Sequence, residues 1–240
     1  MFDIIFASLF CLLFGFIIFR LKILDLIGTF AAVILGLIIG VFAGFEWLSL
    51  VIIFIIISFI TTRYRYSYKH ELGVAEKNRG KRNHFSVVAN GLIPAVFAIL
   101  WFVNQDTFFG TILKAGYIAS VATVTGDTLS SEIGMLSKNK PVLITSFKPV
   151  PVGTHGGITL LGEIGGLMGV LLIGFSSYAI GLASLELSLI AALVGGTLGF
   201  NFDSILGAIL ERRKLIDNST VNLLSSLTGG FVGIRIALSL

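Results

Sequence analysis

Charge, cysteine and proline are all scarce in this sequence. Only 12% of its 240 residues are charged, about half the share in a typical soluble domain. The single cysteine, Cys11, excludes a disulfide within the chain, and no group of Cys and His residues has the spacing of a zinc site. These shortages exclude a soluble domain held together by disulfides or zinc.

Long apolar runs take the place of the missing charge. Hydrophobic residues make up 55% of the chain, and the mean hydropathy is +0.99. A helix of about 20 apolar residues crosses a hydrocarbon core about 30 Å thick, and runs close to that length recur throughout. We therefore predict an all-α, polytopic transmembrane bundle of about eight helices. The predicted helices cover residues 2–19, 24–43, 47–62, 85–103, 107–124, 158–180, 184–200 and 219–240.

The connections divide the chain into three parts. Residues 1–62 hold three predicted helices, residues 63–84 form a basic loop, and residues 85–240 hold the other five helices and most of the polar motifs. The first segment carries Asp3 where a secretory signal would carry basic residues, so we expect it to be retained as a helix.

Basic residues fix the predicted orientation. Fifteen of the seventeen Lys and Arg residues fall in four alternate connections, within residues 20–22, 63–82, 138–148 and 212–214. Because Lys and Arg favour cytoplasmic loops, we expect both termini outside and these four connections in the cytoplasm. The pI of about 9.3 then comes from basic residues beside the membrane, which attract anionic lipids. We therefore expect no binding of nucleic acid.

The first polar motif covers residues 79–84, just before the fourth predicted helix. Lys81, Arg82 and Asn83 precede the positive end of that helix dipole, an arrangement that suits a phosphate. Asn90 lies within the same helix. Ordinary membrane anchoring explains the basic residues equally well, although it does not explain Asn90.

The second motif, residues 125–132, follows the fifth predicted helix. If that helix continues, Asp127 and Ser131 share a face, whereas Glu132 points elsewhere and needs a break to converge with them. Carboxylate and hydroxyl ligands favour Mg²⁺ over zinc. The alternative is a solvated aspartate at the membrane surface.

Two further motifs lie in basic connections. Lys148 precedes the glycine-rich turn 153–157, whose backbone amides can approach an anion closely; a plain re-entrant turn is the alternative. The other motif is at Asp203 and Ser204, where an aspartate is followed by a hydroxyl residue, as at Asp127 and Thr128. Two acidic helix ends can therefore together hold magnesium.

These motifs supply carboxylates for a metal, cations for phosphates and glycine turns, all on one face of the predicted bundle. Phosphoryl transfer needs chiefly positioning and charge neutralisation, which this set provides. A location at the membrane surface indicates a substrate with a phosphate head and a lipid chain.

Residues 79 to 230 resemble a family of membrane kinases. The resemblance rests on the motifs at 80–83, 90–91, 125–134, 153–157 and 202–208, in matching order and spacing. This family includes the plant phytyl-phosphate kinase of vitamin E synthesis and transmembrane protein 19. The first three helices match in hydropathy only.

The resemblance implies a kinase that converts phytyl, geranylgeranyl or farnesyl phosphate into the diphosphate, with CTP or ATP as donor. Residues 85–240 would form its catalytic membrane core. Asp127, Glu132 and Asp203 would hold Mg²⁺, and Lys148 would act beside them. The implied substrate-binding residues are Lys81, Arg82, Asn83, Asn90, Ser131, Gly153, Thr154, Gly156, Gly157 and Ser204.

A transporter or flippase for a small anion or lipid is the competing prediction, since intramembrane charges and related halves are typical of transporters. Against it, the polar residues lie at one face and not at the midplane.

Overall fold

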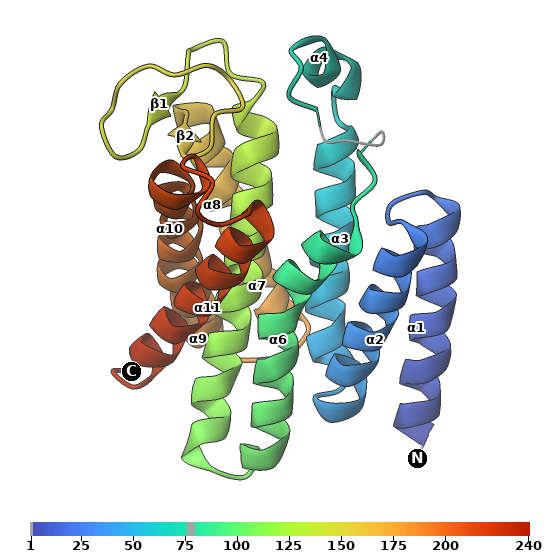
Figure 1. Cartoon of the computed structure of the whole chain (residues 1–240). Coiled ribbons are helices and arrows are strands. Elements are labelled where there is room, and N and C mark those ends of the chain that lie inside the picture. The colour runs from blue at the N-terminus through green and yellow to red at the C-terminus, as the bar shows by residue number, and fades with distance from the viewer. Residues whose placement is uncertain (1, 76–79) are drawn as a thin grey trace.

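Long helices dominate the structure, a computed structural model that describes residues 2–75 and 80–240. Within those ranges the chain forms eight long segments, which confirms the predicted all-α bundle (Figure 1). The first six are single helices: α1 (Phe2–Arg20), α2 (Leu26–Phe42), α3 (Phe45–Arg63), α6 (His84–Asn104), α7 (Phe108–Gly134) and α8 (Leu160–Ala179). The seventh runs through α9 (Leu185–Ile190), η1 (Ala191–Gly196), α10 (Thr197–Leu206) and η2 (Gly207–Glu211), and the eighth is α11 (Asn218–Ala237).

The long connections gather at one end of the bundle. Figure 1 shows the short helix α4 (Tyr66–Glu71) and the two-stranded pair β1 (Val142–Leu143) and β2 (Gly157–Ile158) at that end, with both chain termini at the other. The basic connections therefore share one end, as their alternation in the sequence predicts. Lys77 and Arg79, two basic residues of the predicted loop, lie outside the described residues.

Five described segments are long and apolar enough to cross a membrane: α3, α6, α7, α8 and the continuous stretch Leu185–Glu211. Ile4–Arg20 and Leu26–Phe42 are shorter apolar helices. The eighth segment, α11, has the length of a span, but polar side chains at its start lower its hydropathy.

Two helices extend further than hydropathy predicts. The helix α7 continues past residue 124 to Gly134, and the seventh segment continues past residue 200 to Glu211. Asp127 and Asp203 therefore lie within helices and not beyond their ends. Apolar composition marks only the stretch that faces lipid or the core, so it misses helical turns whose polar side chains face a pocket.

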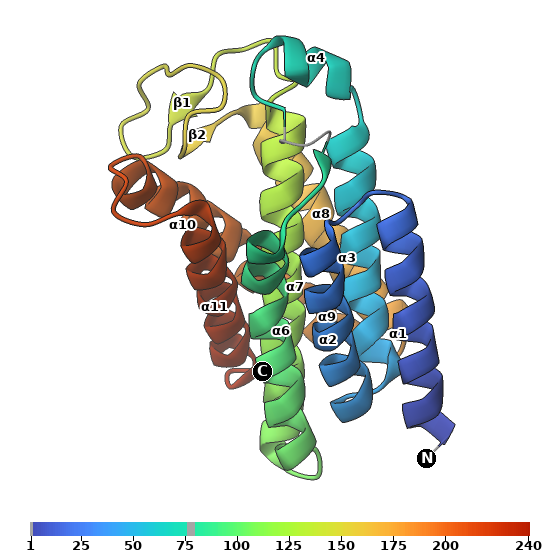
Figure 2. The same cartoon turned by 45° about the vertical axis from the view of Figure 1, so that its right-hand side comes forward.

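The helix α7 is the centre of the bundle. It packs against α8, α11, α6 and α3, which lie around it (Figure 2). Glycine permits these close approaches, since a Cβ on Gly126 would lie 2.8 Å from Phe200 Cδ1. In the buried core the Tyr117 hydroxyl donates to Trp47 O at 2.5 Å, which joins α7 to α3.

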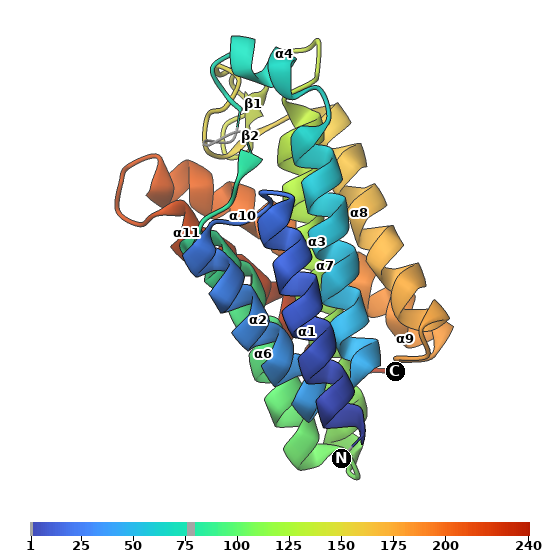
Figure 3. The same ribbon diagram turned by 90° about the vertical axis from the view of Figure 1, so that its right-hand side faces the viewer.

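The first three helices pack directly onto the rest of the chain. The helix α2 packs against α1 and α6, whereas α3 packs against α7 and α8 (Figure 3). Residues 1–62 are thus part of one bundle with the predicted catalytic core.

Candidate active site

Two aspartates from separate motifs meet at the end that carries the long connections. The carboxyl groups of Asp127 on α7 and Asp203 on α10 lie within hydrogen-bonding distance of each other. Asp203 is only 8% exposed. Two carboxylates at this range repel unless a proton or a cation lies between them. The pair is therefore the strongest indication of a cation site in the described chain.

A cavity of about 330 Å³ surrounds this pair. We call it the acidic pocket. It is lined by the ends of α6, α7, α10 and α11 and by the loop before α8. Most of the predicted site residues line it: Arg82, Asp127, Ser131, Glu132, Gly153, Thr154, Gly156, Gly157, Asp203 and Ser204.

The start of α11 orients Asp203. With the Asn222 amide oriented by its hydrogen-bond partners, its nitrogen donates to Asp203 Oδ2 and to Asn218 O, each at 3.2 Å. Sequence reasoning assigned this helix to close packing and missed both residues. The signal was present, because Asn218 and Asn222 are amide residues one turn apart at the start of this helix.

The turn into α11 is fixed by its own cap. Asp217 accepts hydrogen bonds at Oδ1 from the Thr220 amide at 2.8 Å and the Thr220 hydroxyl at 2.7 Å. These bonds lower the pKa of the Asp217 carboxyl, because they favour its charged form. The capped turn holds Asn218 and Asn222 at the edge of the acidic pocket.

Arg82 supplies the positive charge of the pocket. Its backbone bridges the α1–α2 connection: Arg82 N donates to Ile23 O at 3.0 Å, and Asp25 N donates to Arg82 O at 3.1 Å. Its guanidinium attracts the Asp127 carboxylate electrostatically. Among the described residues no ion pair holds the Arg82 side chain.

Glu132 has a different partner from the one that we predicted. No break interrupts α7 before Gly134, so Glu132 does not turn toward Asp127. Its Oε2 instead pairs with Lys69 Nζ at 2.5 Å. The charge of the Glu132 carboxylate is thus balanced by the Lys69 ammonium, although Glu132 borders the pocket.

Four other predicted residues lie away from the acid pair. Lys148 is exposed, and neither it nor Lys81 lines the pocket. Asn83 caps α6, because its Oδ1 accepts from Ser86 N at 3.1 Å. Asn90 lines a second cavity, and its amide lies 3.3 Å from that of Asn222.

The glycine turn packs against the pocket wall. Gly156 has φ +75°, and a Cβ there would lie 2.5 Å from Ala208 N and 2.6 Å from Ser204 O. Only glycine fits this contact without strain. The next residue back, His155, lies with its Nδ1 3.1 Å from Glu211 Oε2. Sequence reasoning missed Glu211, which lines the pocket at the end of the seventh segment.

Comparison with known proteins identifies the family. A family described as integral membrane protein DUF92 matches residues 9–230. The chain belongs to this family. It is therefore a multi-pass integral membrane protein, and its apolar helices are membrane spans.

Three relatives of this DUF92 protein cover most of its length. An uncharacterized membrane protein of Methanocaldococcus jannaschii is 38% identical over 90% of this chain and 86% of that protein. Protein PGR of Arabidopsis thaliana is 32% identical over 88% of this chain and 80% of that protein. Protein VTE6, chloroplastic, of Arabidopsis thaliana is 28% identical over 86% of this chain, and the match spans 63% of VTE6. No solved structure matches.

The donor set of this DUF92 protein has room for substrate ligands. The described residues contain no cluster of three or more His, Cys, Asp and Glu side chains that could hold a metal ion. Mg²⁺ commonly takes one or two protein carboxylates and completes its octahedron with water and substrate phosphates.

Proposed function

We propose that this protein is a membrane prenyl-phosphate kinase. It transfers a phosphoryl group from a nucleoside triphosphate, CTP or ATP, to phytyl, geranylgeranyl or farnesyl phosphate and releases the diphosphate. The observation that carries the proposal is the Asp127–Asp203 pair with the Arg82 guanidinium beside it. The likeness to VTE6 supports it, because four of the five motifs of the resemblance to phytyl-phosphate kinase contribute residues to the pocket.

Asp127 and Asp203 would hold Mg²⁺ between the protein and the donor phosphates. When bound, the ion neutralises phosphate charge and aligns the transferred group. Glu132 is left out of this ligand set, because its carboxylate already pairs with Lys69.

The side chains around the pair have separate tasks. Arg82 binds the acceptor phosphate, and Asn222 holds the Asp203 carboxylate in place. An oxygen of the acceptor phosphate attacks the terminal phosphorus of the donor. The bond from that phosphorus to its bridging oxygen breaks, and the nucleoside diphosphate leaves with the electron pair. The attacking oxygen is already anionic, so this step needs no general base.

The proposed active site faces the cytoplasm. The acidic pocket lies at the end with the long basic connections, and such connections favour the cytoplasmic side.

The test is a direct assay of the purified protein with Mg²⁺, radiolabelled CTP or ATP, and geranylgeranyl phosphate. Wild type should form labelled diphosphate, and Asp127→Asn and Asp203→Asn should lower the rate at least about a hundredfold. Both variants should remain folded, because each removes one of two repelling charges. Absence of product with every prenyl phosphate, together with uptake of an anion or lipid by proteoliposomes, would establish a transporter instead.

A further inference from the structure

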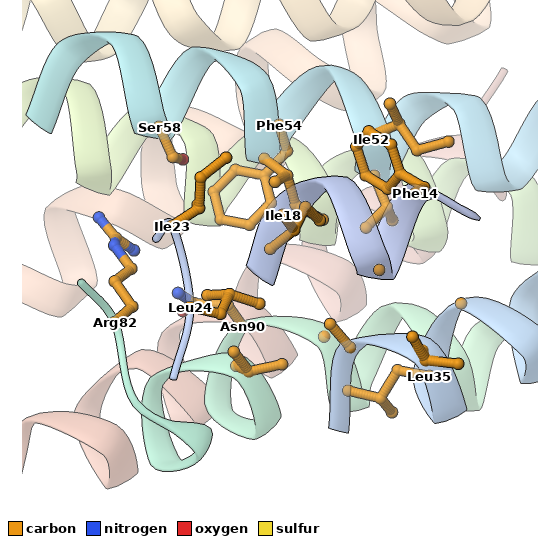
Figure 4. Close-up of a pocket in the computed structure, with 18 of the residues that line it drawn as sticks. Phe14, Ile18, Ile23, Leu24, Leu35, Ile52, Phe54, Ser58, Arg82 and Asn90 are labelled. Atoms are coloured by element: carbon orange, nitrogen blue, oxygen red, sulfur yellow. The ribbon is translucent and has the colours of Figure 1, made fainter. Parts of the chain in front are cut away.

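A second cavity lies among the first membrane helices. Apolar side chains of α1, α2, α3 and α6 line it, and we call it the apolar groove. In Figure 4, Arg82 lies at one end, and Phe54, Ile18, Ile52 and Phe14 extend away from it. The groove therefore has one charged end and a long hydrophobic body.

Helix packing creates this groove. The helices α1, α2 and α6 pack in sequence against one another, whereas α3 is held from the other side by α7 and α8. The groove lies in the space between these two groups. The groove is narrow and its lining is almost wholly apolar, which suits one slender chain better than a bulky ligand.

The groove and the acidic pocket meet at shared residues. Arg82 and Ser86 line both cavities. One molecule can therefore place an anionic head between Arg82 and the acid pair while its apolar chain lies along the groove.

Two buried hydroxyl groups near the charged end lack partners among the described residues. The Ser58 and Thr62 side chains line the groove and are only 5% and 2% exposed, yet Ser58 Oγ and Thr62 Oγ1 make no hydrogen bond within residues 2–75 and 80–240. An unpaired buried hydroxyl costs free energy, so such groups commonly serve a ligand or an ordered water. Their position beside Arg82 places them next to a bound headgroup.

We propose that the apolar groove holds the isoprenoid chain of the acceptor, with its phosphate at Arg82 and the last part of the chain between Phe14 and Ile52. This inference rests on the proposed kinase function for the identity of the chain. On α3 the lining extends from Thr62 past Ile52 to Leu48, about 21 Å at the rise of an α-helix. An extended geranylgeranyl or phytyl chain has a comparable length. Phe14 and Ile52 then contact the part of the chain that a longer substrate has and a shorter one lacks.

Photocrosslinking of the wild-type protein tests the site without requiring activity. A geranylgeranyl phosphate analogue with a diazirine at its far end should label α1 and α3 near Phe14 and Ile52, as mapped by mass spectrometry. Excess geranylgeranyl phosphate should prevent labelling, whereas excess phosphatidic acid should not. Labelling confined to lipid-facing surfaces, or equal displacement by phosphatidic acid, overturns the proposal.

A pair of variants tests the length limit. Ile52→Trp should block the far end and lower the ratio of kcat/KM for geranylgeranyl over farnesyl phosphate about tenfold, since it excludes part of the longer chain from burial. Ile56→Trp is the matched control, because Ile56 lies one turn away on α3, is 45% exposed and does not line the groove. It should keep the wild-type ratio.

The outcomes separate this inference from the proposed function. Groove labelling without any diphosphate product supports the chain site and rejects the kinase. Diphosphate formation with an unchanged ratio in a folded Ile52→Trp protein rejects the chain site and leaves the kinase intact. If Ile52→Trp does not fold, the wild-type labelling pattern decides.

Discussion

Lys69 and Glu132 form an ion pair that is almost fully enclosed by protein. Lys69 is 1% exposed, and its Nζ also donates to the backbone oxygens of Thr61 and Thr62, at 3.0 and 2.9 Å. Glu132 lies on the central helix α7 and Lys69 on α4. The pair therefore fastens the connection after α3 to the helix that carries Asp127.

Removing one partner of this pair should destabilise the protein. Glu132→Gln leaves a buried lysine without its counterion, which costs about 3–5 kcal/mol. We expect a clear fall in the melting temperature in detergent, and partial recovery in the double variant Lys69→Met/Glu132→Leu. A Glu132→Gln protein with unchanged melting temperature and a raised Mg²⁺ requirement would instead make Glu132 a metal ligand.

Asn222→Ala should weaken metal binding without removing a metal ligand. Asp203 loses the amide that donates to its Oδ2, and the loss of such an outer partner typically lowers metal affinity about 10–100-fold. The measurement is the Mg²⁺ concentration that gives half-maximal diphosphate formation. Thr228→Ala is a suitable control, since Thr228 is on the same helix but its hydroxyl bonds only to Leu224 O. Equal Mg²⁺ requirements in the two variants would contradict the assigned role of Asn222.

Arg82→Gln should affect the acceptor more than the nucleotide. Its guanidinium lies where the apolar groove meets the acidic pocket, so its loss should raise KM for geranylgeranyl phosphate about tenfold or more. The KM for the nucleotide should change less. Lys81→Gln offers a matched control, because Lys81 is adjacent in sequence but lines neither cavity. The same KM change in both variants would reject a specific role for Arg82.

Gly156→Ala should displace the loop over the acidic pocket. The new methyl group would overlap Ala208 N and Ser204 O, and φ is +75° at this residue. Strain of this kind costs about 1–3 kcal/mol. We expect lower activity and faster proteolysis of the 141–157 loop. Lys148→Ala, in the same loop but exposed, should change neither property; a large loss of activity there would restore the catalytic role that the sequence predicts for Lys148.

Periodic hydrophobicity and the alternation of basic residues were enough to predict the bundle and the common end of its long connections. The approach of Asp127 to Asp203 also followed from placing both motifs at that end. The partner of Glu132 could not be predicted, because Lys69 lies 63 positions away in the sequence and looks like any other residue of a basic loop. Asn222 was missed because hydropathy averages over a helix and hides a single polar face. Helix ends at 124 and 200 were wrong for the same reason.

The junction at Arg82 and Ser86 has a kinetic consequence. The apolar groove lies among membrane-spanning helices, whereas the acidic pocket lies among the connections at one end. A lipid and a nucleotide would thus arrive by separate routes, one within the bilayer and one from water, and neither would obstruct the other. Substrate addition should be random in order. Product nucleotide should compete with the donor nucleotide while leaving the apparent affinity for the lipid nearly unchanged.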